Sequence, residues 1–548
     1  MSHVFLTGFM GAGKSTVGAL VAERLGRPFL DLDAVIGERE GASVADIFSA
    51  RGETGFREAE HAALVALVER GPSVVATGGG AVLREDNQAL LRRHGTVVYL
   101  AVSPEEAMAR LGDAGDRPLL AGEGLAAARS ILDSRLALYR ATADAVVDTG
   151  GRTPAEVAEA VIAALGAGGG EHVVRVGAPD APDAYDIVSG EGLIDRLGEY
   201  ARELVSGRSI ALVSDTAVWA LYGERAAASL RDAGFAVSTH IVPAGELSKS
   251  WERAGALLEE FAGAGIDRAS AAVALGGGVV GDLTGFCAAT YMRGIPVLQV
   301  PTTLLAQVDS AIGGKTGVDL AAGKNLAGAF WPPRLVLADT ASLQTLPPAE
   351  WTNGLVETAK AALLDGGLAL ADFERDLPSV VGREPHAVAS AVRAAAAFKA
   401  RVVSEDLRES GVRECLNLGH TLGHALERLT GYATLPHGLA VAEGMRFAAD
   451  LAARAIGAPA ETAVVTRRLL EEVGAGEVAC RAVLDRHFDR LRPGDVLAAM
   501  KADKKSRDGV VRFVLLETPG CWAVEAVEDA ILLEELARWV SRPGEGGV

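Results

Sequence analysis

Short apolar runs and amphipathic stretches alternate along the first third of the chain. Residues 4–7, 74–77 and 97–101 are compact apolar runs, as expected of buried strands. Helical patterns lie between them. SPEE at 103–106 and TPAE at 153–156 read as capping boxes with proline at the first helical position. This alternation predicts an α/β unit.

The apolar runs recur in the middle of the chain, and the pattern changes beyond Asp339. From there, long stretches rich in Ala, Leu, Val, Glu and Arg predict a helical region, closed by a strand signal at 510–516. We expect the tail from Ser541 to be disordered. The middle runs predict a second, mostly parallel sheet, with strands at 173–176, 210–214, 238–242, 271–275 and 297–300.

A glycine-rich segment, GAGGGE at 166–171, is the clearest linker in the 548 residues. The length predicts several domains. We therefore expect three domains, over 1–165, 172–340 and 341–548. The motifs and family resemblances that follow imply a P-loop domain, a Rossmann-like dinucleotide-binding α/β domain and a mainly helical metal- and substrate-binding domain, in that order. The predicted fold class is α/β.

Composition excludes several classes of partner. Hydrophobic residues make up 49% and charged residues 23%, which is ordinary for a globular protein, and the net charge of −19 argues against nucleic-acid and anionic-membrane binding. The 4 cysteines form no CxxC pair, which suggests a reducing compartment. Without a signal peptide or a spanning apolar run, we expect a cytoplasmic protein with small-molecule partners. A homodimer through the C-terminal half is left open.

The first chemical signal is a phosphate-binding loop. Residues 8–15 read GFMGAGKS, directly after a predicted strand and before a helical run at 16–25. Backbone N–H groups of such a loop wrap phosphates, Lys14 reaches the β and γ oxygens, and the Ser15 hydroxyl binds Mg²⁺. The spacing and its context together predict an ATP site.

Two acidic residues follow in LDLD at 30–33. Asp31 and Asp33 point to the same side if the segment is extended. Taken alone, such a pair is usually a solvated strand end. Beside a P-loop, it predicts a Mg²⁺ partner and a group that orients a substrate hydroxyl.

Residues 1–165 resemble shikimate kinase. The resemblance rests on GFMGAGKST, DLD, FRxxE at 56–60, TGGG at 77–80, DRPLL at 116–120 and RLALY at 135–139. It implies ATP contacts at Gly11, Ala12, Gly13, Lys14, Ser15, Thr16, Arg110 and Arg117, with Lys14 and Arg117 catalytic and Mg²⁺ on Ser15 and Asp31. It implies shikimate contacts at Asp33, Arg57, Gly79, Gly80 and Arg135.

The second chemical signal is LNLGHTLGHALE at 416–427. His420 and His424 lie four apart and share one face if the segment is helical, which is a spacing that metal ligands use. Repeated glycines are unusual there because glycine weakens a helix by about 1 kcal/mol. The carboxylate of Glu357 and the imidazole of His437 are further candidates. Spacing alone does not decide which histidines bind the metal.

Other segments suit a dinucleotide and a phosphate ester. LGGGVVGD at 275–282 follows a predicted strand, although its glycines do not spell the full dinucleotide fingerprint. PAGELSKS at 243–250 offers Glu246 and Lys249. The small and polar residues of 301–319, with GKNLAGAF at 323–330, hardly suit a plain core helix.

Residues 171–548 resemble 3-dehydroquinate synthase. The resemblance implies a Zn²⁺ or Co²⁺ ion on Glu357, His420 and His437, with His424 beside the substrate. Leu439 departs from the family, where Glu often follows the HG pair. NAD⁺ contacts are implied at Asp215, Glu246, Lys249, Gly277, Gly278, Asp282, Thr302 and Thr303. Catalytic or substrate contacts are implied at Arg293, Asp309, Lys315, Lys324, Asn325, Lys360, Lys399, Arg413, Asn417, His424, Lys504 and Lys505, with the last two not distinguished.

The two resemblances together predict a bifunctional shikimate-pathway enzyme. One half would phosphorylate shikimate with ATP, and the other would convert 3-deoxy-D-arabino-heptulosonate 7-phosphate to 3-dehydroquinate and phosphate, with NAD⁺ regenerated. The alternatives for the second half are a metal-dependent polyol dehydrogenase and a related cyclase that acts on glucose 6-phosphate. For the first half, the alternative is a nucleotide-sensing module without kinase activity.

Overall fold

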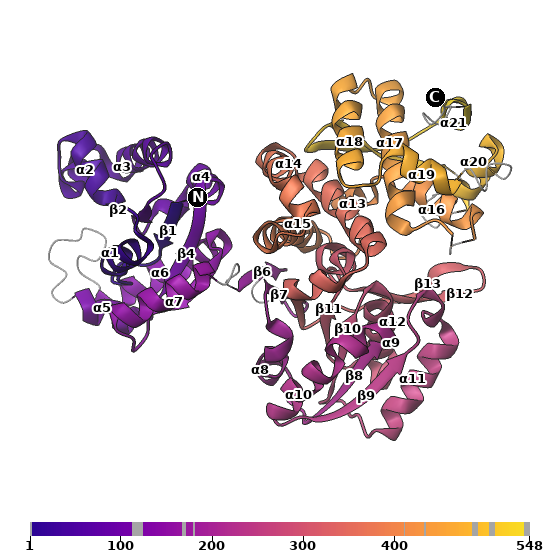
Figure 1. Cartoon of the computed structure of the whole chain (residues 1–548), viewed down its shortest axis with the longest axis horizontal. Coiled ribbons are helices and arrows are strands. Elements are labelled where there is room, and N and C mark those ends of the chain that lie inside the picture. Colours follow the sequence, from indigo (N-terminus) through magenta and orange to yellow (C-terminus); the bar gives the residue numbers. More distant parts are fainter. Residues whose placement is uncertain are drawn as a thin grey trace. The chain divides into compact units, whose positions relative to one another are not determined.

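The chain forms two compact units, Met1–Val173 and Val174–Val548 (Figure 1). The short segment 167–170, inside the predicted linker, and the C-terminal tail from residue 542 lie outside the described residues. No helix in the described part of the chain is long and apolar enough to cross a membrane. The computed structural model describes residues 3–111, 124–166, 171–178, 181–409, 411–431, 434–484, 491–502 and 510–541.

The first unit is built on a parallel five-stranded sheet in the order β2-β3-β1-β4-β5. All five residues of the central strand β1 are buried, because apolar side chains cover both faces of a parallel sheet. The phosphate-binding loop leaves the carboxyl end of this central strand. The strands are β1 (His3–Thr7), β2 (Phe29–Asp31), β3 (Val74–Ala76), β4 (Gly95–Ala101) and β5 (Ala145–Asp148).

Helices join these strands in alternation, and two of them begin at the predicted capping signals, at Pro104 and Pro154. At TPAE, the Glu156 carboxylate accepts from the Thr153 backbone N–H at 2.8 Å, and the Thr153 hydroxyl accepts from the Glu156 N–H at 3.3 Å. The predicted capping box is therefore confirmed. The helices are α1 (Lys14–Leu25), α2 (Leu32–Glu40), α3 (Val44–Val68), η1 (Ala81–Leu83), α4 (Glu85–His94), α5 (Pro104–Leu111), α6 (Gly124–Thr142) and α7 (Pro154–Gly166).

The second unit contains a seven-stranded sheet in the order β6-β7-β14-β11-β10-β8-β9. The pairings from β7 to β9 are parallel. Five strands match predicted apolar runs, whereas β7 and β14 were not predicted from the sequence. The strands are β6 (His172–Val176), β7 (Tyr185–Gly190), β8 (Ser209–Asp215), β9 (Ala236–Val242), β10 (Ala271–Gly276), β11 (Val297–Pro301) and β14 (Leu335–Asp339).

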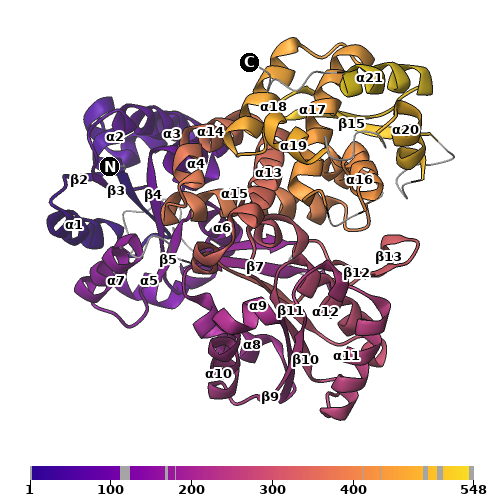
Figure 2. The ribbon, with the colours of Figure 1, turned by 45° about the vertical axis from the view of Figure 1, so that its right-hand side comes forward.

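Helices flank this sheet, and one hairpin leaves it. The antiparallel hairpin of β12 (Lys315–Leu320) and β13 (Gly323–Phe330) reaches toward the helices of the same unit in both views (Figures 1 and 2). The remaining elements are η3 (Leu193–Arg196), α8 (Leu197–Leu204), α9 (Thr216–Val218), η4 (Trp219–Gly223), α10 (Glu224–Asp232), η5 (Glu246–Ser248), α11 (Trp251–Gly263), α12 (Gly278–Thr290), η6 (Tyr291–Arg293) and η7 (Ala306–Ser310).

The chain beyond β14 is mainly helical, as predicted, and one continuous apolar core runs through it. The predicted late strand is β15 (Arg512–Thr518), which pairs with β16 (Cys521–Ala526). The helices are η8 (Thr340–Thr345), α13 (Pro348–Asp365), α14 (Gly367–Val381), α15 (Pro385–Glu405), η9 (Val412–Asn417), α16 (His420–Leu429), α17 (His437–Ala455), α18 (Ala460–Glu472), α19 (Glu477–Leu484), α20 (Pro493–Lys501) and α21 (Asp529–Ser541).

Glycines set the contact between α16 and α17. A Cβ atom on Gly444 of α17 would overlap the carbonyl oxygen of Gly419, which caps the start of α16. A Cβ on Gly423 would lie 3.1 Å from the Ala440 carbonyl oxygen. The backbones therefore meet where side chains would hold them apart. This contact explains the glycines that the sequence repeats beside its histidines.

We predict that Gly444→Ala destabilises the second unit by about 1–3 kcal/mol, because a methyl group must push the Gly419 backbone away in a packed core. Chemical denaturation followed by circular dichroism measures the change. Gly255→Ala is the matched control. It lies in the interior of α11 with nothing within 4 Å of the added Cβ, so it should stabilise by about 0.5–1 kcal/mol. Equal stability of the two variants would contradict the close contact.

Candidate active sites

The phosphate-binding loop of the first unit has the backbone that such a loop needs. Gly8, Gly11 and Gly13 adopt φ values of 143°, 80° and 86°, which favour glycine. Gly13 has no side chain to cap α1, so the first backbone N–H groups of this helix, which have no partner within it, are left to bind an anion. The Lys14 ammonium donates to the carbonyl oxygens of Gly8 at 2.8 Å and Phe9 at 3.0 Å. The arrangement suits a polyphosphate.

The predicted magnesium partners lie side by side. The Ser15 hydroxyl donates to the Asp31 carboxylate at 2.6 Å, which places the start of α1 against the end of β2. The other Asp31 oxygen accepts from the Asp33 backbone N–H at 3.1 Å and thereby caps α2. A hydroxyl beside a carboxylate, next to the phosphate loop, is a ligand set that Mg²⁺ accepts.

The predicted shikimate contacts converge on the glycines after β3. The Gly79 carbonyl oxygen accepts from Arg135 at 3.1 Å and from the Tyr139 hydroxyl. A Cβ on Gly80 would overlap the Arg57 guanidinium, and a Cβ on Gly78 would lie 3.2 Å from an Asp33 carboxylate oxygen. Side chains from three segments thus meet around these glycines, which leave room for the Arg57 guanidinium.

Glu60 belongs to this group, although the sequence interpretation gave it no role. Its buried carboxylate accepts from Arg57 at 2.7 Å. Burial raises the pKa of Glu60, Arg57 opposes that rise, and the nearby Asp33 charge adds to it. Glu60 holds the guanidinium in place. The FRxxE motif contained the signal, because an Arg and a Glu three residues apart share one face of a helix.

Of the two remaining residues predicted for the kinase site, the structure describes only Arg110. Arg110 donates to the Thr149 hydroxyl at 2.9 Å and to the Thr149 carbonyl oxygen at 2.6 Å, at the end of β5. Arg117 lies outside the described residues, with the rest of the DRPLL motif.

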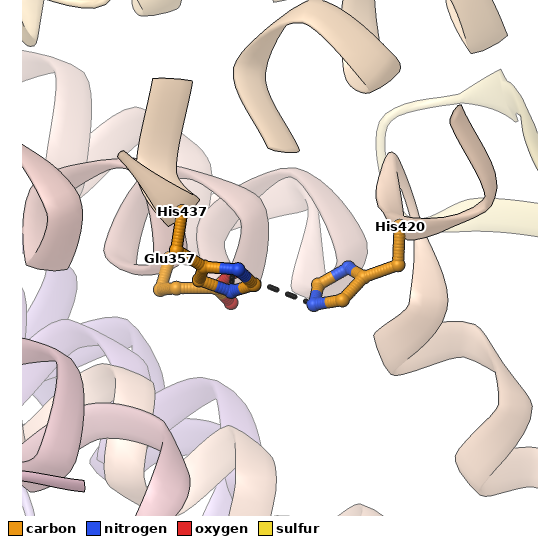
Figure 3. A group of neighbouring side chains, drawn as sticks. All are labelled: Glu357, His420 and His437. Atoms are coloured by element: carbon orange, nitrogen blue, oxygen red, sulfur yellow. Dashed lines mark ion pairs between the residues drawn. The ribbon is translucent and has the colours of Figure 1, made fainter. Parts of the chain in front are cut away.

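In the second unit, three side chains from different helices form a candidate metal centre. Glu357 lies in the middle of α13, and His420 and His437 are the first residues of α16 and α17. The Glu357 Oε1 atom lies 3.8 Å from the Nε2 atom of each histidine. Figure 3 shows the side chains pointing toward one another. Their ligand atoms all lie within 4.8 Å of one another.

The chemistry of these donors fits a divalent metal ion. Glu357 is buried, and its Oε1 atom has no hydrogen-bond partner among the described residues. Two imidazole nitrogens and a carboxylate are ordinary ligands of Zn²⁺ and Co²⁺. His424 is not among the grouped ligand atoms, although its ring centre lies 5.4 Å from that of His420, about as close as the 5.5 Å between His420 and His437. The spacing of four residues therefore does not identify the group that converges.

The glycine loop after β10 forms a cradle at the start of α12. Added Cβ atoms on Gly277 and Gly278 would lie 3.0 Å from the side chains of Thr303 and Ser310. The buried hydroxyls of Thr302 and Ser310 have no hydrogen-bond partner within the described chain. Close backbone approach, a helix N-terminus and unpaired hydroxyls fit a dinucleotide.

The other predicted dinucleotide contacts lie at the same edge of the sheet. Lys249 and Asp282 form a buried ion pair, with Nζ 2.5 Å from Oδ2. The carboxylate of Asp215, at the end of β8, accepts from the backbone N–H groups of Ala217 and Val218 at 2.8 and 2.9 Å. These groups are positioned by the carboxyl ends of parallel strands, where nucleotides bind in this class of sheet.

A cluster of cations lies between the sheet and the helices of the second unit. The Lys399 ammonium donates to the carbonyl oxygen of Asp309 at 2.6 Å and to its carboxylate at 2.5 Å. Arg413 donates to the Gly313 carbonyl oxygen at 3.1 Å. Lys360 pairs with Glu357 and donates to the Leu416 carbonyl oxygen at 2.8 Å. These cations are far apart in the sequence, and Lys360 links them to the candidate metal centre through its ion pair with Glu357.

Glu409 completes the cluster and was missed by the sequence interpretation. Its carboxylate pairs with Lys315 and accepts from the Asn417 side-chain amide at 3.0 Å. It lies in a loop before the GHTLGH segment at 419–424, where no spacing singles it out. Glu427 was also missed, although it ends the same segment. Its carboxylate lies 3.4 Å from Nδ1 of His437.

Among the described residues, one predicted substrate contact lies away from the glycine loop. Arg293 lies beyond the C-terminal end of α12, about 20 Å along that helix from the glycine loop. Lys504 and Lys505 lie outside the described residues. Lys324 and Asn325 are on the β12–β13 hairpin, where the Asn325 N–H donates to the Asp319 carboxylate at 2.8 Å.

These folds and sites define a P-loop phosphotransferase joined to a dinucleotide- and metal-dependent enzyme. Residues 10–166 match the family model for shikimate kinase. Residues 239–353 and 354–506 match those for the N-terminal and C-terminal parts of 3-dehydroquinate synthase. The chain belongs to the shikimate kinase family in its first unit and to the 3-dehydroquinate synthase family in its second. It is thus a bifunctional shikimate-pathway enzyme, and the predicted fold class and function are confirmed.

Individual relatives support this family assignment for the second unit. The 3-dehydroquinate synthase of Nitrosomonas europaea is 40% identical over 359 residues, which cover 65% of this chain and 95% of the relative. The 3-dehydroquinate synthase of Citrifermentans bemidjiense is 42% identical over 355 residues, which cover 64% of this chain and 95% of that relative. Among solved structures, 2-deoxy-scyllo-inosose synthase with carbaglucose-6-phosphate, NAD⁺ and Co²⁺ is 26% identical, with 67% and 99% covered and a TM-score of 0.59. The higher identities favour the synthase over the other cyclases.

The cation cluster generates a pH prediction. Burial lowers the pKa of Lys399 to about 8, Asp309 opposes that change, and the Arg413 charge adds to it. The ammonium is present below that pH and is lost above it. An anionic substrate should therefore bind less well in alkali, and synthase kcat/KM should fall by about tenfold per pH unit above the pKa. Lys399→Arg, which stays charged, should remove this inflection. Its persistence in the variant would assign it to another group.

Proposed function

We propose specific roles for the residues of the kinase site. Lys14 and the backbone of the glycine loop hold the ATP phosphates, while Ser15 and Asp31 hold Mg²⁺. The 2.6 Å contact between those two side chains supports this pairing. Lys14 also neutralises charge on the transferred phosphoryl group, which lowers the barrier to its transfer.

The shikimate roles rest on the convergence around the glycines after β3. Arg57 and Arg135 bind the substrate carboxylate, since guanidinium groups match its planar geometry. Asp33 orients the attacking hydroxyl, and the backbone at Gly79 and Gly80 approaches the sugar-like ring. In this proposal, Glu60 fixes the direction of Arg57 through the 2.7 Å hydrogen bond.

For the synthase site, we propose that Glu357, His420 and His437 hold a divalent metal ion, Zn²⁺ or Co²⁺. The observation that carries this assignment is the approach of one ligand atom from each residue to within 4.8 Å of the others. Solved relatives support it: the 2-epi-5-epi-valiolone synthase of Streptomyces hygroscopicus, 26% identical with a TM-score of 0.58 and with 68% of this chain and 100% of that chain covered, has NAD⁺ and Zn²⁺ bound.

NAD⁺ belongs in the cradle at the start of α12. In this proposal, the N-terminus of α12, with Gly277 and Gly278, holds its phosphates, and Thr302 and Thr303 line the loop. Asp215, Glu246, Lys249 and Asp282 position the rest of the cofactor. When bound, NAD⁺ supplies reversible hydride transfer, and the metal ion supplies Lewis-acid assistance at a hydroxyl group.

The cations act on the substrate itself. Lys315, Lys360, Lys399 and Arg413 bind its phosphate and carboxylate, because clustered lysines and arginines suit these anions. Asp309 keeps Lys399 in position through the hydrogen bonds at 2.5 and 2.6 Å. His424, close to the metal group but outside it, moves a proton during turnover. The substrate is 3-deoxy-D-arabino-heptulosonate 7-phosphate, and the products are 3-dehydroquinate and phosphate.

A cytoplasmic location is also part of the proposal. All four cysteines are free thiols, as expected in a reducing compartment.

The two activities should separate by mutation. Lys14→Ala removes the cation that neutralises the transferred phosphoryl group, so we expect shikimate phosphorylation to fall at least 1,000-fold while 3-dehydroquinate formation stays within about twofold. A coupled assay for ADP and mass detection of 3-dehydroquinate measure both. Lys501→Ala, a lysine paired with Asp529 far along the chain, is the control and should preserve both activities. Loss of both activities in a folded Lys14→Ala protein would contradict separate sites.

The metal assignment predicts different outcomes for the histidines. His420→Ala and His437→Ala should lose bound metal and synthase activity together, because each removes a ligand. His424→Ala should retain its metal and turn over slowly. Elemental analysis of the purified variants measures metal content.

Kinase activity is the internal control for these variants. It should survive all three substitutions and stop when Mg²⁺ is withdrawn. A metal-free His424→Ala protein beside a metal-replete His437→Ala protein would contradict the ligand set.

A further inference from the structure

In the two histidines of the proposed metal centre, the Nδ1 atoms have different hydrogen-bond partners. Each ring directs Nε2 toward Glu357, with both distances at 3.8 Å. The Nδ1 atom of His420 lies 3.1 Å from the Leu418 carbonyl oxygen. The Nδ1 atom of His437 lies 3.4 Å from a carboxylate oxygen of Glu427. Only the second contact depends on a side chain, so only the second can be changed by substitution.

The other carboxylate oxygen of Glu427 contacts the β12–β13 hairpin. The Glu427 side chain lies on α16 and is 5% exposed, and its Oε1 atom is 3.5 Å from Nζ of Lys324 on the β12–β13 hairpin. The same ammonium lies 3.2 Å from the Glu246 carboxylate, which is among the proposed NAD⁺ contacts. The hairpin lies next to α16 in Figures 1 and 2. One buried carboxylate therefore stands between a metal ligand and the dinucleotide side of the site.

We infer that Glu427 is a positioning residue, which orients His437 for the metal ion and, through Lys324, fixes the hairpin against the dinucleotide side. A carboxylate that accepts from Nδ1 sets the tautomer with Nε2 free for the metal and makes the imidazole a better ligand. The inference rests on the proposed ligand set. It adds a role for a residue outside the proposed ligand set.

The first test is metal affinity in the absence of substrate. Glu427→Gln keeps the size of the side chain and removes its charge. We expect the apoprotein to bind Co²⁺ 10- to 100-fold more weakly, with an altered visible absorption spectrum of the bound ion. Competition with a chelator gives the affinity. Co²⁺ affinity within twofold of the parent protein, with an unchanged spectrum, would overturn the inference.

A matched control is available in the same unit. His240 and Glu260 form another carboxylate–histidine pair, with Nδ1 2.9 Å from Oε2, on β9 and α11. Glu260→Gln makes the same chemical change away from the proposed metal group, so Co²⁺ affinity and spectrum should not change. An equal loss in this control would show a general effect on stability and would overturn the specific role.

His437→Ala separates failure of the inference from failure of the proposed ligand set. Normal Co²⁺ affinity in His437→Ala would remove the ligand assignment itself. A weak His437→Ala beside a normal Glu427→Gln would remove only the role of Glu427. If Glu427→Gln does not fold, Glu427→Asp withdraws the carboxylate by one methylene group, and it must show the same direction of change.

A double-mutant cycle tests the link to the hairpin. Lys324→Met and Glu427→Gln should each raise the dissociation constant of NAD⁺, measured by fluorescence titration at saturating Co²⁺. The dissociation constant of the double variant should stay within about twofold of the larger of the two single-variant values, since both changes break the same contact. Fully multiplicative effects would overturn the link between Glu427 and Lys324.

Discussion

The close contact of α16 with α17 is the constraint on which the synthase site depends. His420 begins one helix and His437 begins the other, so the separation of the helices fixes the separation of two proposed metal ligands. Gly419 and Gly444 permit an approach that any Cβ would prevent. Glycine costs about 1 kcal/mol of helix stability at an interior position. That cost is offset by an apolar core that surrounds both helices.

The two units build their sites by different physical means. In the kinase unit, one loop of consecutive residues supplies backbone N–H groups, and side chains add charge around it. In the synthase unit, the groups come from a hairpin, several helices and the ends of parallel strands. Each buried cation there has an anionic or carbonyl partner, such as Asp309 for Lys399 and the Leu416 carbonyl for Lys360. Burial without such partners would be too costly.

Local patterns in the sequence predicted much of the fold and part of the sites. The phosphate loop spans eight residues, and its strand and helix are where the apolar pattern predicted them. The strands β7 and β14 escaped prediction because YDIVSG and LVLAD are short runs with polar ends beside loop-like sequence. The fold class is confirmed, whereas the individual site residues remain predictions.

The limits of sequence reasoning are clearest at the metal centre. A spacing of four singles out His420 and His424, yet His420 groups with Glu357 and His437, which are distant in the chain. No periodicity links a position on α13 with the first residue of α17. Glu409 and Glu427 were not predicted as site residues for the same reason. Folding brings the cation or imidazole beside each carboxylate, and no local pattern in the sequence shows that contact. The resemblance to a known family provided the grouping that spacing could not.

The pairing of Glu409 with Lys315 has a consequence for the design of inhibitors. A ligand that targets Lys315 must compete with a carboxylate already attached to the protein, so part of its electrostatic gain is lost in breaking that pair. Arg413 donates to backbone carbonyl oxygens instead, at 2.6 Å to Leu407 and 3.1 Å to Gly313. Neutral acceptors hold a cation less strongly than a carboxylate does. Because Arg413 is only 1% exposed whereas 46% of the Lys315 side chain is exposed, a ligand reaches Lys315 first, and the displacement of Glu409 is the cost of that contact.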